Sequence, residues 1–88
     1  MNEYEVVVHR KVDKFLEGLK ERVRIRILDV IRDLGNYPLV LKRYDIKKIK
    51  GRENTYRVRI GELRLIFHVD KELRRIVVSN IGYRGEIY

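Results

Sequence analysis

The chain has 88 residues, a net charge of +8, a pI of about 10.0 and no cysteine. This length fits one domain with a modest core, and the lack of cysteine excludes disulfides and thiolate chemistry. The positive charge is concentrated late in the chain. Residues 1–41 hold eight Lys/Arg against seven Asp/Glu, whereas residues 42–88 hold thirteen against six. We therefore expect a polyanionic partner: nucleic acid, an acidic protein or an anionic membrane surface.

The sequence shows neither a membrane span nor a signal peptide. No apolar run approaches the roughly 18 residues that a transmembrane helix needs. The N-terminus is charged from Glu3 and has the pattern of a strand. We expect a cytoplasmic protein that forms a single domain over residues 1–88 and makes no membrane contact.

The first half of the chain predicts one strand followed by two helices. Residues 4–9 are rich in valine and alternate in polarity, which is typical of a strand. Apolar residues then recur at helical spacing over residues 12–19. A longer amphipathic stretch over residues 21–34 predicts a second helix that ends at Gly35 and Pro38. Because few residues separate the two helices, they should form an antiparallel hairpin.

Residues 55–68, TYRVRIGELRLIFH, predict a β-hairpin with a two-residue loop at Gly61 and Glu62. This loop pairs Arg59 with Arg64, and alternation places Arg57 on the same face. The other face is apolar or aromatic: Tyr56, Val58, Ile60, Leu63, Leu65 and Phe67. Like charges facing each other across strands cost on the order of 0.2–1 kcal/mol. Solvated arginines are the simplest interpretation of that face, but they explain the facing pair least well.

The remaining segments complete an α+β fold. Residues 39–44 show no clear pattern, and residues 45–51 suggest a short extended piece or a basic loop. Residues 73–81 predict a last strand, and residues 82–88 form a tail. The predicted order is β-α-α-β-β-β, an antiparallel sheet with the helical hairpin packed on one face. The arginine-bearing face would then be open to solvent or to a ligand.

The sequence indicates neither a metal site nor a hydrolytic triad. Its histidines are His9 and His68, and a metal ion beside the arginines would be repelled. Ser79 is the single serine and Thr55 the single threonine, and neither has an evident His–Asp partnership. There is no glycine-rich phosphate loop either. We expect no metal and no cofactor.

What remains is a cationic surface suited to phosphate. Arginine presents a planar fork that matches phosphate oxygens, and preplaced cations stabilise the charge that develops during phosphoryl transfer. RNA carries its own nucleophile, the ribose 2′-hydroxyl. Strand scission therefore needs only a base, charge stabilisation and in-line positioning. The candidate residues for RNA binding nearby in sequence are Lys47, Lys48, Lys50 and Arg52.

The base is the open question. Arginine stays protonated in proteins and cannot serve. Tyr88 follows Arg84 by four residues, and a phenol close to several cations has its pKa lowered from the usual value of about 10. Tyr88 is therefore a candidate for proton transfer or for stacking on a base, provided that the tail folds back over the sheet.

The whole chain resembles the RelE/ParE superfamily of toxins from toxin–antitoxin modules, and RelE in particular. The residues that carry the resemblance are Ile49-Lys50-Gly51, Tyr56-Arg57-Val58-Arg59, Leu63-Arg64-Leu65-Ile66-Phe67, and Arg84 with Tyr88. The resemblance implies a ribosome-dependent endoribonuclease that cleaves messenger RNA in the A site without metal and leaves a 2′,3′-cyclic phosphate. It also implies an acidic RelB-like antitoxin as partner, besides the ribosome and its message.

The same resemblance implies roles for particular residues. Arg57 and Arg59 look like the two strand positions, commonly lysines, that handle the proton and the charge. Arg64 resembles the arginine that contacts the scissile phosphate, and Arg84 and Tyr88 complete the site. Arginine at positions 57 and 59 departs from the lysine pattern and shifts the role of base to Tyr88 or to water. Two alternatives stay open: a ParE-like toxin that inhibits a topoisomerase, and a basic RNA-binding domain without chemistry.

Overall fold

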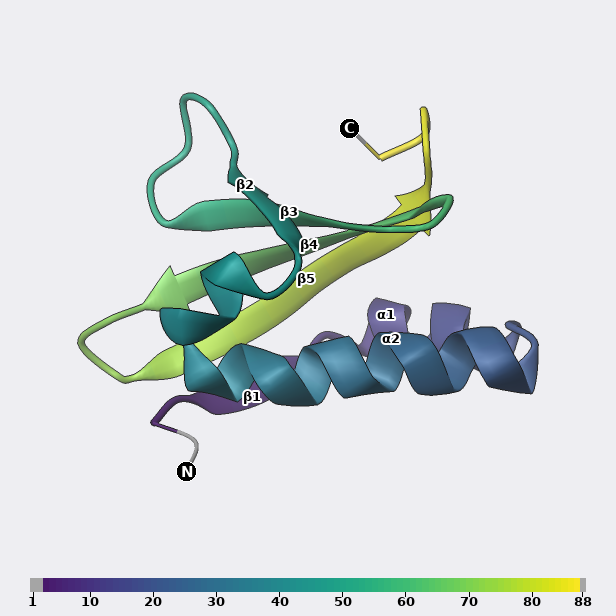
Figure 1. The fold of residues 1–88 in the computed structure, drawn as a ribbon, viewed down its shortest axis with the longest axis horizontal. Coiled ribbons are helices and arrows are strands. Elements are labelled where there is room, and N and C mark those ends of the chain that lie inside the picture. The colour runs from purple at the N-terminus through teal and green to yellow at the C-terminus, as the bar shows by residue number, and fades with distance from the viewer. Residues whose placement is uncertain (1–2, 88) are drawn as a thin grey trace.

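The computed structural model describes residues 3–87 (Figure 1). In chain order the elements are β1 (Glu5–Val8), α1 (Arg10–Glu17), α2 (Glu21–Asp33), two 3₁₀ turns (Leu34–Asn36 and Leu39–Lys42), β2 (Asp45–Lys48), β3 (Thr55–Ile60), β4 (Leu63–Asp70) and β5 (Arg75–Tyr83). The described strands form one sheet in the order β1-β5-β4-β3-β2. Neither helix of this part of the chain has the length and apolar character of a membrane span.

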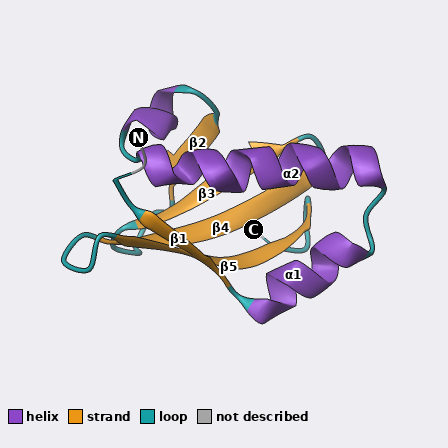
Figure 2. Ribbon diagram, turned by 90° about the horizontal axis from the view of Figure 1, so that it is seen from below, coloured by secondary structure: helices purple, strands orange, loops and turns teal. Residues whose placement is uncertain are grey.

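Both helices lie on the same face of the sheet, as Figure 2 shows from the helix side. α1 buries Val12 and Leu16, and α2 buries Ile27, Val30 and Ile31. The sheet meets them with fully buried side chains: Val58, Leu65, Phe67, Ile76 and Val78. Burying one such aliphatic or aromatic side chain contributes about 1.5–3 kcal/mol. The predicted α+β fold, with its helices on one face, is confirmed.

Three features of the sheet differ from those expected from sequence. Residues 45–48 form a further strand, β2, at the edge beside β3. Natural proteins protect sheet edges with short, highly charged strands of this kind. Because β2 has four residues and three of them are charged, it lacks the alternation of apolar and polar residues that identifies a strand from sequence. At the opposite edge β1 pairs with β5 in parallel, which makes the sheet mixed. The last strand also begins and ends two residues later than expected, at Arg75 and Tyr83.

The hairpin of β3 and β4 has the predicted register. Ile60 pairs with Leu63 and Arg59 with Arg64, so the loop consists of Gly61 and Glu62. Gly61 has a φ of +59°, and a glycine in this conformation at the first loop position is typical of the type II′ turn. The loop length places the arginines of both strands on one face.

Candidate active site

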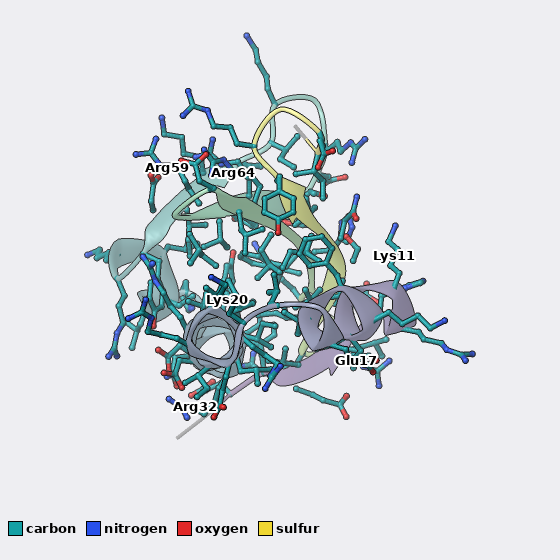
Figure 3. The ribbon with its side chains drawn as sticks, turned by 90° about the vertical axis from the view of Figure 1, so that its right-hand side faces the viewer. Lys11, Glu17, Lys20, Arg32, Arg59 and Arg64 are labelled. Atoms are coloured by element: carbon teal, nitrogen blue, oxygen red, sulfur yellow. The ribbon has the colours of Figure 1, made fainter. Side chains whose placement is uncertain are left out.

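The arginines of the hairpin lie on the sheet face opposite the helices. We call this surface the arginine face; its residues are Asp45 and Lys47 of β2, Arg57 and Arg59 of β3, and Arg64 of β4, which strand pairing places side by side. In Figure 3, Arg59 and Arg64 lie on one side of the sheet, with Lys20, which precedes α2, and Arg32 of α2 on the other. The predicted placement of three arginines on the face opposite the helices is confirmed. The expectation that this whole face is open is wrong at Arg64, which is buried.

Asp45 explains how these arginines coexist. It lies directly opposite Arg59 in the β2–β3 ladder. One of its carboxylate oxygens is 3.2 Å from Nε of Arg59, and the other is 3.6 Å from Nη2 of Arg57. A carboxylate between two guanidinium groups offsets their mutual repulsion. Sequence reasoning missed Asp45 because residues 45–51 did not show a clear strand pattern.

The two arginines of β3 differ in exposure. The side chain of Arg59 is 58% exposed, whereas that of Arg57 is 19% exposed. Nε of Arg57 is buried and has no hydrogen-bond partner among the described residues. A buried donor without a partner carries a desolvation cost, so Arg57 keeps unused hydrogen-bonding capacity inside the site.

Arg64 is buried, with only 7% of its surface exposed. Its Nη1 donates to the carbonyl oxygens of Gly61 and Leu63, each at 2.9 Å. The guanidinium is therefore turned back along the hairpin loop and held there by the backbone. These two bonds use one nitrogen of the fork and leave Nε and Nη2 outside them. Arg64 is thus a fixed cation within the sheet face rather than a mobile surface charge.

The C-terminal tail folds back over the arginine face. Gly82 pairs with Arg64 across β4 and β5, and a Cβ at Gly82 would lie 3.2 Å from the side chain of Ile87. Ile87 therefore lies over the sheet beside Arg64. The tail is tied to the hairpin loop by the backbone N–H of Arg84, which donates to the carbonyl of Glu62 at 2.8 Å.

The side chain of Arg84 is exposed. Its backbone is held next to the hairpin loop, within the same tail segment that carries the Gly82–Ile87 contact. The predicted role of Tyr88 concerns a residue that lies outside the described range. The fold-back that this role required is nevertheless present up to Ile87.

The basic residues before the hairpin do not form one surface. Lys47 pairs with Arg57 and belongs to the arginine face, whereas Lys48 pairs with Tyr56 and points to the other face. Lys50 and Arg52 are exposed on the turn between β2 and β3. Of the four residues predicted to bind RNA, Lys47 is the one that strand pairing joins directly to the arginines.

His68, on the same side of the sheet, is partly buried and hydrogen-bonded to a neighbouring strand. The ring Nδ1 of His68 lies 2.9 Å from the hydroxyl oxygen of Thr55. Burial lowers the pKa of His68 from its ordinary value, and the positive charge of Arg52 lowers this pKa further. The ring is therefore mainly neutral at pH 7. The described residues contain no group of three or more His, Cys, Asp or Glu side chains that could hold a metal ion.

Comparison with known proteins identifies the family. No family model matches the chain. However, a Methanocaldococcus jannaschii protein assigned as toxin RelE1 is 32% identical over 85 residues, covering 97% of this chain and 94% of that protein. This chain belongs to the RelE toxin family.

Solved structures agree with this membership of the RelE family. A chain in the crystal structure of the archaeal RelE–RelB complex from Pyrococcus horikoshii OT3 has 28% identity and a TM-score of 0.82, covering 96% of this chain and 98% of that chain. A chain in the RelB–RelE complex from Methanococcus jannaschii has 29% identity and a TM-score of 0.75, with coverage of 93% and 94%. The resemblance to RelE inferred from the motifs is confirmed.

Proposed function

We propose that this chain is the toxin of a toxin–antitoxin pair and that it cleaves messenger RNA in the ribosomal A site. The observation that supports this most is the arginine face: Asp45 forms ion pairs with Arg57 and Arg59, and Lys47 and Arg64 lie beside these two arginines on the sheet face opposite the helices. Membership of the RelE toxin family also supports this proposal. Surfaces that are only solvated do not need a cation as deeply buried as Arg64.

The proposed reaction uses the RNA's own nucleophile. The ribose 2′-oxygen attacks the adjacent phosphorus as the bond from phosphorus to the 5′-oxygen breaks. The 2′-hydroxyl loses a proton to a base, and the leaving 5′-oxygen gains one. The products are a 2′,3′-cyclic phosphate and a 5′-hydroxyl. Arg57, Arg59 and Arg64 would stabilise the negative charge that develops on the phosphate oxygens. Because arginine cannot accept the proton, the base is Tyr88 or a water molecule.

The partner that suits this surface is an acidic RelB-like antitoxin. The related structures above are complexes of RelE with RelB. The chain has a net charge of +8, which favours fast association with an acidic protein. Its sheet also has two outer strands, β1 and β2, and an outer strand is a place where a partner strand adds. We propose that such an antitoxin covers the arginine face.

The experiment is to add the protein to translating ribosomes and to map the ends of the message. We expect cuts at A-site codons with 2′,3′-cyclic phosphate termini on the upstream fragments. An intact message together with inhibited DNA supercoiling by gyrase would favour a ParE-like toxin instead. An intact message together with salt-sensitive binding to any RNA would favour a binding domain without chemistry.

A further inference from the structure

Asp45, on the outer strand β2, is an acidic residue in a site that we propose to bind an anion. Its carboxylate contacts Arg57 at 3.6 Å and Arg59 at 3.2 Å. A phosphate would use the same guanidinium donors, so a carboxylate there competes with the substrate for them. Asp45 should therefore weaken the binding of RNA, so any contribution that it makes to function must be to a step other than binding.

The two arginines depend on Asp45 to different degrees. Arg59 is mostly exposed, so water can solvate its charge whether or not the carboxylate is present. Arg57 is mostly covered, and its buried Nε has no hydrogen-bond partner within residues 3–87. Asp45 is the residue with which Arg57 forms an ion pair in that range. Without it, a partly desolvated cation on a flexible stem would turn outward to water.

We propose that Asp45 is the positioning residue of this site, holding Arg57 in the sheet face beside Arg59 so that the scissile phosphate meets a prearranged pair of guanidinium groups. The inference rests on the proposed nuclease function. It assigns Asp45 an effect on the rate of the bound complex rather than on affinity, because a fixed cation stabilises the transition state without reorganising. Asp45 acts through Arg57 and does not itself touch the RNA.

The test compares Asp45→Asn with Asp13→Asn. Both remove one negative charge, but Asp13 is exposed on α1, on the helix side of the sheet. Single-turnover cleavage is followed on programmed ribosomes over a range of toxin concentrations. We expect Asp45→Asn to lower the rate at saturation by about 10-fold to 100-fold. The half-saturating concentration should stay the same or fall, because a competing anion is gone. Asp13→Asn should keep the rate of the wild-type protein.

A second background separates positioning from a general loss of structure. If Asp45 acts through Arg57, Asp45→Asn should lower the rate little further in a protein that already carries Arg57→Ala. An undiminished loss in that background would overturn the inference. So would a wild-type saturation rate in Asp45→Asn, or a raised half-saturating concentration with an unchanged rate.

A spectroscopic measurement keeps this result distinct from the proposed function. Hydrogen exchange at Nε of Arg57, followed by NMR in the free protein, should accelerate in Asp45→Asn and stay unchanged in Asp13→Asn. Unchanged exchange in Asp45→Asn would overturn the positioning role even if the protein cleaves message. If the wild-type protein left the message intact, the nuclease function would be wrong and the catalytic part of the inference with it. Exchange would then still decide whether Asp45 holds Arg57.

Discussion

Arg59 and Arg64 face each other directly across the β3–β4 hairpin, yet their guanidinium groups have opposite environments. The side chain of Arg59 is 58% exposed and pairs with Asp45. Arg64 is buried and donates to two carbonyls of the hairpin loop. One charge is thus balanced by a carboxylate and the other by backbone dipoles. This division lets two arginines share a face.

The adjacent lysines of β2 provide a matched pair for the RNA-binding surface. Lys47 lies beside Arg57 on the arginine face and Lys48 points to the other face, although both are exposed. We expect Lys47→Ala to weaken binding of a single-stranded RNA and to reduce the dependence of log K on log salt by about 0.7. Lys48→Ala should change both much less. Equal losses in the two variants would contradict a single binding face.

The tail contact predicts a local steric effect at Gly82. A Cβ there would lie 3.2 Å from Ile87, tighter than ordinary contact. Gly82→Ala should therefore displace the tail and lower the rate of cleavage, with a change in unfolding free energy below about 1 kcal/mol because the tail is peripheral.

Shortening Ile87 should relieve the steric conflict that Gly82→Ala creates. Adding Ile87→Ala to Gly82→Ala should recover part of the lost rate, since the isoleucine side chain that the new Cβ meets is removed. A double variant that is slower than Gly82→Ala would show that Ile87 matters for another reason. Cleavage kinetics of the three proteins under the same conditions decide between these outcomes.

Most of the fold could be predicted because its elements are strongly patterned. The apolar stripes of α1 and α2 and the alternating pattern of β3 and β4 predict which side chains are buried. Gly61 predicts the length of the hairpin loop. The strand β2 could not be assigned, since Ile46 is its single apolar residue and is only half-buried. The parallel pairing of β1 with β5 joins residues about 70 positions apart, a relationship that local periodicity does not contain.

The site could be predicted in part for the same reason. The position of Arg57, Arg59 and Arg64 on one face follows from strand alternation, which is a local property. The ion pairs of Asp45 and the contact of Ile87 with Gly82 follow from tertiary placement. One signal was available: an aspartate in the same alternating phase as Lys47, two residues before it.

The start of β2 is held by a hydrogen bond from Tyr44 to Asp33 at the end of α2. The Tyr44 hydroxyl lies 2.5 Å from Oδ2 of Asp33, and this bond, together with burial, raises the pKa of Tyr44 above its usual value. Hydrogen bonds to charged groups contribute about 1.5–3 kcal/mol, and partial exposure of Tyr44 reduces this. We expect Tyr44→Phe to lower the unfolding free energy by about 1 kcal/mol in urea. Tyr83→Phe, which removes an exposed hydroxyl, should cost less; an equal cost would contradict this account.

His68 predicts how stability depends on pH. Burial and the charge of Arg52 lower its pKa in the folded protein, so the unfolded chain binds a proton first as the pH falls below about 6.5. The stability that comes from a neutral His68 is therefore fully present above that pH. It is lost as the pH falls towards the pKa of His68 in the folded protein. We expect the urea midpoint to decrease from pH 7.5 to pH 5.5. His68→Gln should flatten this dependence; a steep dependence in His68→Gln would assign it to other groups.

The most direct test of the nuclease account is the rate of A-site cleavage by Arg64→Ala on translating ribosomes. Arg22→Ala, which removes an exposed arginine from α2, is the matched control, and circular dichroism verifies that both variants are folded. We predict that the wild-type protein and Arg22→Ala cut the message, and that Arg64→Ala is slower by about 100-fold or more. Cleavage by Arg64→Ala at the rate of the wild-type protein would contradict the assignment of the arginine face as the catalytic surface.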